Sequence, residues 1–136
     1  YIYLNQPRLT AAAGSALALL IAAIHLYELP AHYAASPVWG ALFALLAAGG
    51  AVAAAGIPAG ARRLGWGLGA ALSLIALLGY LASRGAGLPG LEEFRGRWDY
   101  PAGTLAMIAE GLFLLGYLSV RTGLAVSYPQ RRRWHD

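Results

Sequence analysis

The hydrophobic residues of this chain form four long runs, separated by short segments rich in proline, glycine and charge. The runs cover residues 9–29, 38–57, 64–83 and 102–120. Each is about 20 residues long, which is the length that an α-helix needs to cross roughly 30 Å of hydrocarbon. The pattern therefore predicts an all-α fold, with one domain over residues 1–136 in which four transmembrane helices form a bundle.

Prolines and aromatic residues lie at the borders of these runs. Pro101 precedes the fourth run, where a helix tolerates proline because the missing N–H would have no partner. Pro30 directly follows the first run and cannot continue the helical hydrogen bonds, so we expect it to end or kink the first helix. The aromatic residues near the run ends are typical of the belt that faces lipid headgroups: Tyr3, Trp39, Trp66, Tyr80, Trp98, Tyr100 and Trp134.

Small residues inside the runs predict close packing of the helices. Gly65 and Gly69 form a G-x-x-x-G pattern in the third run, and the fourth run contains Gly111 and Gly116. In lipid, helices associate through faces of small residues that allow their backbones to approach. These glycines therefore indicate a compact bundle.

The composition excludes most soluble classes of protein. Hydrophobic residues make up 59% of the chain and charged residues 12%, whereas a soluble domain is about one quarter charged. This is too little polar surface to cover a water-soluble domain. The chain has no cysteine, which excludes disulfides, thiolate chemistry and iron–sulfur clusters.

The positive charge is carried by arginine alone and predicts the orientation in the membrane. The formal net charge is +4, but the arginines flank apolar runs, where they set topology and meet lipid headgroups instead of nucleic acid. The positive-inside rule predicts that both termini face the cytoplasm. We expect the membrane to be the inner membrane of a bacterium. Seven arginines lie on the cytoplasmic side and three on the other: Arg8, Arg62, Arg63, Arg121 and Arg131 to Arg133 against Arg84, Arg95 and Arg97.

Few ionisable residues lie within the runs, and two of them share one helical stripe with His32, which lies just after the first run. His25, Glu28 and His32 are spaced i, i+3 and i+7, which places them on the same face of a helix. Two imidazoles and a carboxylate on one face are a ligand set for a transition metal such as Cu or Zn. An ionisable group in the bilayer is costly and usually faces the bundle interior, where it has a partner.

A second group of polar residues lies at a similar depth on the outer side. Glu110 of the fourth run can meet His25 across the bundle, and Tyr80 and Arg84 stand at the same level. With His25 and His32, these residues are candidates for binding haem or a chlorophyll-type pigment. Two histidines on one stripe cannot hold both faces of one haem, so a second axial ligand would come from elsewhere.

Other interpretations of the same residues remain open. A His25–Glu110 pair can serve only to hold helices together, in a structural or assembly subunit. A minimal proton-coupled transporter is a further alternative, which four helices allow only as a dimer. The chain contains none of the sequence motifs of metalloproteases, α/β-hydrolases, P-loop proteins or dinucleotide-binding enzymes, so no enzyme activity is expected.

The outer polar motifs resemble those of small uncharacterised bacterial four-helix integral membrane proteins with a histidine-bearing first helix. The resemblance rests on the stretch from His25 to Gly40, the turn from Ser83 to Pro89, and Glu110. It implies four helices and an outer polar cluster but no particular reaction. We therefore expect a lipid-embedded protein that binds a metal or a haem or pigment cofactor, as an accessory subunit of a redox or light-harvesting membrane complex or as a homo-oligomer.

Overall fold

The chain folds into four helices and one short 3₁₀ turn. The computed structural model describes residues 5–126, without the side chain of Arg62. The helices are α1 (Pro7–Ala35), α2 (Pro37–Gly56), α3 (Arg62–Arg84) and α4 (Pro101–Arg121), and the 3₁₀ turn η1 (Glu92–Phe94) lies between α3 and α4. All four helices are long and apolar enough to cross a membrane. The predicted all-α class is confirmed, as is the prediction of four helices with the length and apolar character that crossing a membrane requires.

The first helix is longer than its apolar run. α1 continues through Pro30 to Ala35, so the expectation that Pro30 ends it is wrong. A membrane helix accommodates proline because neighbouring groups compensate for the lost backbone hydrogen bond. The linker to α2 is consequently the single residue Ser36, whose N–H donates to the carbonyl of His32. Continuity of α1 keeps His25, Glu28 and His32 on one helix.

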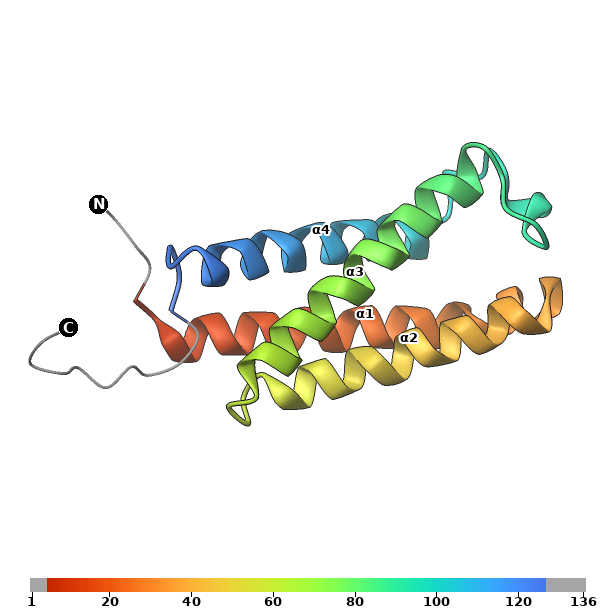
Figure 1. Ribbon diagram of the computed structural model, residues 1–136. Coiled ribbons are helices and arrows are strands. Elements are labelled where there is room, and N and C mark those ends of the chain that lie inside the picture. The colour runs from red at the N-terminus through yellow and green to blue at the C-terminus, as the bar shows by residue number, and fades with distance from the viewer. Residues whose placement is uncertain (1–4, 127–136) are drawn as a thin grey trace, which may run out of the picture.

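The helices form a ring in which α3 runs obliquely. α1 packs against α2 and α4, and α3 also packs against α2 and α4, while α1 and α3 have few contacts. Figure 1 shows α3 crossing the other helices diagonally. We call the end that carries Ala35, Pro37, Arg84 and Pro101 the η1 end, and the end that carries Pro7, Gly56, Arg62 and Arg121 the terminal end.

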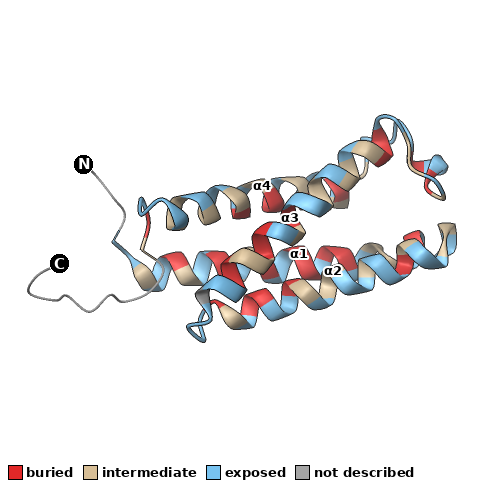
Figure 2. Cartoon of the chain, viewed as in Figure 1, coloured by how far each residue is buried: buried red, intermediate tan, exposed pale blue. Residues whose placement is uncertain are grey.

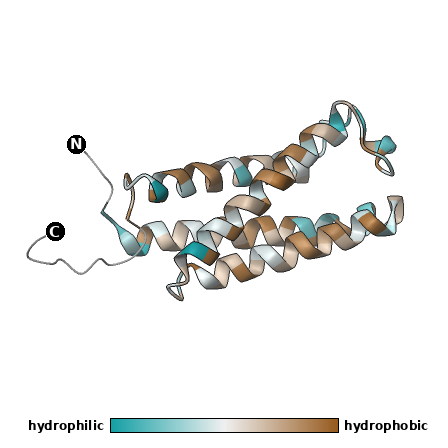
Figure 3. Cartoon of the chain, in the orientation of Figure 1, coloured by the Kyte–Doolittle hydropathy of each residue, from teal (hydrophilic) through white to brown (hydrophobic). Residues whose placement is uncertain are grey.

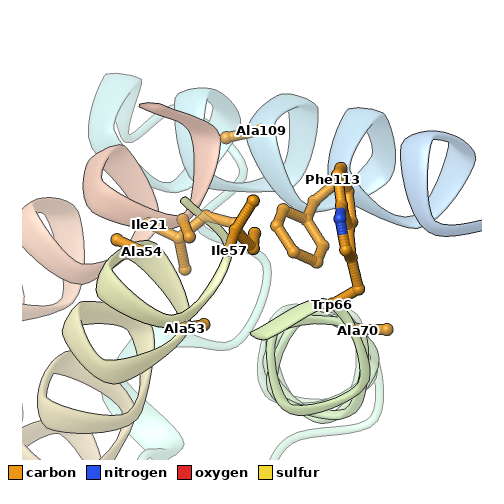
Figure 4. Packing of buried hydrophobic residues seen from close by; sticks show 9 residues of the cluster. Ile21, Ala53, Ala54, Ile57, Trp66, Ala70, Ala109 and Phe113 are labelled. Atoms are coloured by element: carbon orange, nitrogen blue, oxygen red, sulfur yellow. The ribbon is translucent and has the colours of Figure 1, made fainter. Parts of the chain in front are cut away.

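The hydrophobic core is small and contains two large aromatic rings. Trp66 of α3 and Phe113 of α4 pack with their ring centroids 5.1 Å apart, surrounded mostly by alanines and isoleucines of α1 and α2 (Figure 4). Trp66 is 4% exposed, so the expectation that it belongs to an interfacial belt is wrong. Its position near the start of α3 suggested the membrane surface, but the ring turns inward to fill the bundle.

Many large apolar side chains point outward, as a lipid-facing surface requires. Leu45 of α2 and Ile75 of α3 are 66% and 61% exposed. Figure 2 shows the buried residues as scattered positions along the helices, and Figure 3 shows hydrophobic residues along all four helices. Burying such faces in lipid removes them from water, which is the dominant favourable contribution in membrane insertion.

The segment from residue 85 to residue 100 folds back over the η1 end. Leu91 and Phe94 are buried, although charged residues lie next to them in the sequence. Gly87 and Gly90 have φ values of +91° and +82°, a backbone region that favours glycine. Trp39 of α2 donates a hydrogen bond from Nε1 to the carbonyl of Pro89 at 2.7 Å. This hydrogen bond holds the segment against α2, and Phe94 stacks on His32 of α1.

Candidate functional site: a cavity at the η1 end

A cavity of about 400 Å³ lies at the η1 end, between α2 and α3. Its walls are mostly apolar and include Leu42, Leu45 and Leu46 of α2 and Leu72 and Ile75 of α3. Cavities of this volume are typical of sites for small organic molecules. The polar side chains of the η1 end also line it: His25, Glu28, His32, Tyr80, Ser83, Arg84 and Glu110.

His25 of α1 and Glu110 of α4 meet across the bundle. Nε2 of His25 lies 3.7 Å from Oε2 of Glu110, and both side chains are almost fully buried. Nδ1 of His25 donates a hydrogen bond to the carbonyl of Ile21 at 2.7 Å, because a carbonyl can only accept. Nε2 is then the nitrogen that faces the carboxyl group, but 3.7 Å is too long for a hydrogen bond, so Oε2 has no hydrogen-bond partner among residues 5–126.

His32 lies against aromatic rings and not against Glu110. Its imidazole stacks between Phe43 of α2 and Phe94 of η1, with ring centroids 3.8 Å and 4.7 Å away. Nδ1 donates to the carbonyl of Glu28 at 2.9 Å. Phe43 also touches His25, with ring centroids 5.2 Å apart. The two histidines therefore share an aromatic neighbour.

Arg84, the last residue of α3, is 2% exposed and is held mainly by aromatic rings. Its guanidinium lies over Tyr80, Phe94 and Tyr100, at 4.5 Å, 4.8 Å and 5.5 Å from the ring centroids. Nε donates to the carbonyl of Arg97, and Nη1 donates to Oγ of Ser83. Among residues 5–126, no carboxylate lies within ion-pairing distance of Arg84. It is a buried cation with cation–π contacts in place of a direct counter-ion.

Several polar atoms at this site have no hydrogen-bond partner. In the described part of the chain, five buried side-chain polar atoms lack one. Three of the five belong to residues that line the cavity, namely the hydroxyl of Tyr80, Nη2 of Arg84 and Oε2 of Glu110. An unsatisfied buried polar group costs about 1–3 kcal/mol, and more when it is charged. Unpaired groups are rare in native proteins, so their concentration at one cavity indicates a missing partner.

The charged surface of the segment over the cavity is solvated. Arg97 donates from Nε to Asp99 at 3.2 Å, and both side chains are substantially exposed. This hydrogen bond holds the pKa of the Asp99 carboxyl below its usual value. An exposed pair of this kind contributes little to stability, and the buried Leu91 and Phe94 fix the position of the segment.

The structure brings only part of the sequence-predicted ligand set together. His25, Glu28, His32, Tyr80, Arg84 and Glu110 all line one cavity, and His25 contacts Glu110. Within residues 5–126, however, no three histidine, aspartate or glutamate side chains gather as a metal site. His25 and His32 direct their rings to different neighbours, so the Cu or Zn site predicted from His25, Glu28 and His32 has no geometric support.

Phe43 and Phe94 are site residues that the sequence did not reveal. Phe43 lies in the middle of an apolar run, where a phenylalanine has no distinguishing signal. Phe94 interrupts the charged sequence from Glu92 to Asp99. A large apolar residue among charges can signal packing, but Trp98 lies among the same charges and is 46% exposed, so this signal does not single out Phe94.

Comparisons with protein-family models, with curated proteins and with solved structures find no match to this chain.

Proposed function

We propose that the protein binds a lipophilic organic molecule in the cavity at the η1 end. The observation that carries this proposal is that Tyr80, Arg84 and Glu110, which each have an unpaired buried polar atom, all line one cavity with apolar walls. A molecule with a polar head and an apolar body would satisfy these atoms and fill the space between the leucines.

The walls indicate where such a molecule enters. Leu42, Leu45 and Ile75 line the cavity and are also exposed on the outside of the helices. In a membrane these side chains face hydrocarbon, so the opening between α2 and α3 leads to the bilayer and not to water. A ligand that reaches the site by this path is itself soluble in lipid.

The polar end of the cavity defines the chemistry of the head of the ligand. Nη2 of Arg84 is a donor and needs an acceptor oxygen, and the hydroxyl of Tyr80 can donate to the same group. The unpaired Oε2 of Glu110 can accept a hydrogen bond from a second polar group. The ligand class is therefore an amphiphile whose head carries at least one acceptor oxygen, with a donor group on the side that faces Glu110.

A haem or a chlorophyll-type pigment is one member of this class. Nε2 of His25 and of His32 is in each case the ring nitrogen that makes no hydrogen bond to the backbone, and an axial ligand would be one of these atoms. Visible absorption of the purified protein tests this member directly. A colourless sample would restrict the proposal to ligands without such a chromophore.

The test compares two unpaired hydroxyl groups that differ in location. Tyr80 lines the cavity, whereas Ser73 of α3 is fully buried outside it, and both hydroxyls lack a partner. We expect the purified wild-type protein to carry an organic molecule that native mass spectrometry detects and solvent extraction releases. Tyr80→Phe should lower its occupancy or affinity by about tenfold, since a lost hydrogen bond to a buried polar group costs about 1–3 kcal/mol.

The control variant Ser73→Ala should retain the bound molecule, because its hydroxyl does not reach the cavity. Glu110→Gln should weaken binding like Tyr80→Phe, while circular dichroism shows unchanged helix content. An empty wild-type protein that takes up no lipophilic molecule from an organic membrane extract would contradict the proposal, as would equal binding by Tyr80→Phe and Ser73→Ala.

A structural role is the second candidate, and the direct contact between His25 and Glu110 favours it. This pair joins α1 to α4, and polar pairs between helices contribute up to about 1–2 kcal/mol in membranes. In a purely structural subunit, Glu110→Gln would lower thermal stability without changing any bound molecule. A stoichiometric partner protein that co-purifies with an empty cavity would support this candidate.

A further inference from the structure

A second cavity lies at the terminal end, on the opposite side of α3. It has a volume of about 580 Å³ and lies between the start of α3 and the end of α4. Arg63 and Arg121 line it together with Trp66, Tyr117 and Val120. Because α3 runs obliquely (Figure 1), it leaves one opening toward α2 at the η1 end and another toward α4 at the terminal end.

The charges around this second cavity are all positive in the described chain. Arg63 and Arg121 are exposed, and no carboxylate lies within ion-pairing distance of either among residues 5–126. The acidic residues of the described chain all lie elsewhere, in the half toward the η1 end or in the segment that covers it: Glu28, Glu92, Glu93, Asp99 and Glu110. Within the part of the chain that the structure describes, no acidic side chain balances this positive charge locally.

The helix ends at this cavity also favour an anion. α3 begins at Arg62 without a side-chain cap, so its first backbone N–H groups add positive potential at this end. The end of α4 would contribute the opposite potential. There, however, the backbone N–H groups of Thr122, Gly123 and Ala125 donate to the carbonyls of Leu118, Val120 and Ser119, which leaves fewer carbonyl groups free.

We propose that the cavity between α3 and α4 binds a phosphate-bearing anion. Arg63 and Arg121 would contact the phosphate oxygens from two helices, because guanidinium groups match phosphate geometry with paired hydrogen bonds. Val120 and the partly buried Tyr117 supply an apolar wall beside the charged group. This combination fits either the headgroup region of an anionic phospholipid or a free phosphate group.

The experiment measures binding to the purified full-length chain in a neutral detergent without phosphate buffer. Isothermal titration uses three probes: a short-chain phosphatidylglycerol, phosphatidylcholine with the same acyl chains, and inorganic phosphate. We expect the anionic phosphatidylglycerol, inorganic phosphate or both to bind at least about tenfold more tightly than phosphatidylcholine, because the zwitterionic headgroup cancels much of the attraction.

The variants Arg63→Gln and Arg121→Gln test whether the cavity is the site. Each should lower affinity for the bound anion by about fivefold or more, and the double variant by about thirtyfold, since each removes a charged contact. Arg8→Gln is the matched control, because Arg8 is an exposed arginine at the terminal end that does not line the cavity. It should change affinity less than twofold.

The outcomes distinguish the sources of the phosphate and can overturn the proposal. Binding of phosphatidylglycerol alone assigns a lipid headgroup, whereas inorganic phosphate that binds and competes assigns a soluble anion. Equal binding of phosphatidylcholine and both anions would overturn the proposal. An equal loss in Arg8→Gln and Arg63→Gln would overturn it too, because it would show a diffuse charge effect instead of a site.

Discussion

At the scale of single residues, the glycines of the bundle make room for rings from neighbouring helices. A Cβ atom at Gly14 of α1 would collide with the ring of Trp66, and one at Gly69 of α3 would collide with Phe113. Gly103 of α4 accommodates Tyr80 in the same way. The sequence predicted close packing at glycines, but the aromatic side chains that occupy these positions come from other helices, and no local pattern reveals them.

The contrast between Gly14 and Gly111 gives a test of this packing. Gly14→Ala should destabilise the protein by about 1–3 kcal/mol, because the added methyl group displaces the buried ring of Trp66 and strains the core. Gly111 lies in α4 with open space around the position of a Cβ atom. Gly111→Ala should leave stability unchanged or raise it by up to about 1 kcal/mol. Thermal unfolding in detergent measures both variants, and equal stability would show that Trp66 does not depend on Gly14.

At the scale of elements, the sequence predicted the helices better than the segment that covers the cavity. Long apolar runs dictate where helices form in lipid, because every backbone polar group must be satisfied within the helix. The same argument could not place Phe94, whose burial depends on the rings of His32 and Tyr100 on other elements. Similarly, the one-face spacing of His25 and His32 placed both at one cavity but could not foresee Phe43 between them.

The segment from residue 85 to residue 100 should depend on Phe94 for its position. Phe94→Ala removes the stacking on His32 and the cation–π contact with Arg84, and truncation of a buried phenylalanine costs about 3–5 kcal/mol. We expect trypsin to cut after Arg95 and Arg97 at least about tenfold faster in this variant, because cleavage follows local opening.

The neighbouring residue provides the control for this measurement. Glu93 is exposed and forms no hydrogen bond with its side chain in the described chain, so Glu93→Ala should be cut at the wild-type rate. Helix content should stay constant in both variants by circular dichroism. Equal cleavage rates in Phe94→Ala and Glu93→Ala would mean that other contacts, such as that between Trp39 and Pro89, hold the segment.

At the scale of the whole molecule, the oblique path of α3 determines where the two cavities lie. Apolar periodicity predicts that helices exist, but the angle between them depends on how side chains such as Trp66 and Tyr80 fit opposite glycines. The sequence therefore predicted the polar residues of the η1 end as one group, including the contact between His25 and Glu110. It could not predict the apolar walls from α2 and α3 or the second cavity near Arg63 and Arg121.

The orientation of the molecule in the membrane is a prediction from arginine placement, and the chain is well suited to test it. Because the chain has no cysteine, single cysteines can be introduced without removing any. Ala59 lies exposed in the connection between α2 and α3 at the terminal end, and Glu93 lies exposed in the segment at the η1 end. With the arginine-rich terminal end in the cytoplasm, a membrane-impermeant maleimide should label Glu93→Cys in intact cells but label Ala59→Cys only after permeabilisation. The reverse pattern would place the terminal end outside and the cavity of the η1 end in the cytoplasmic leaflet.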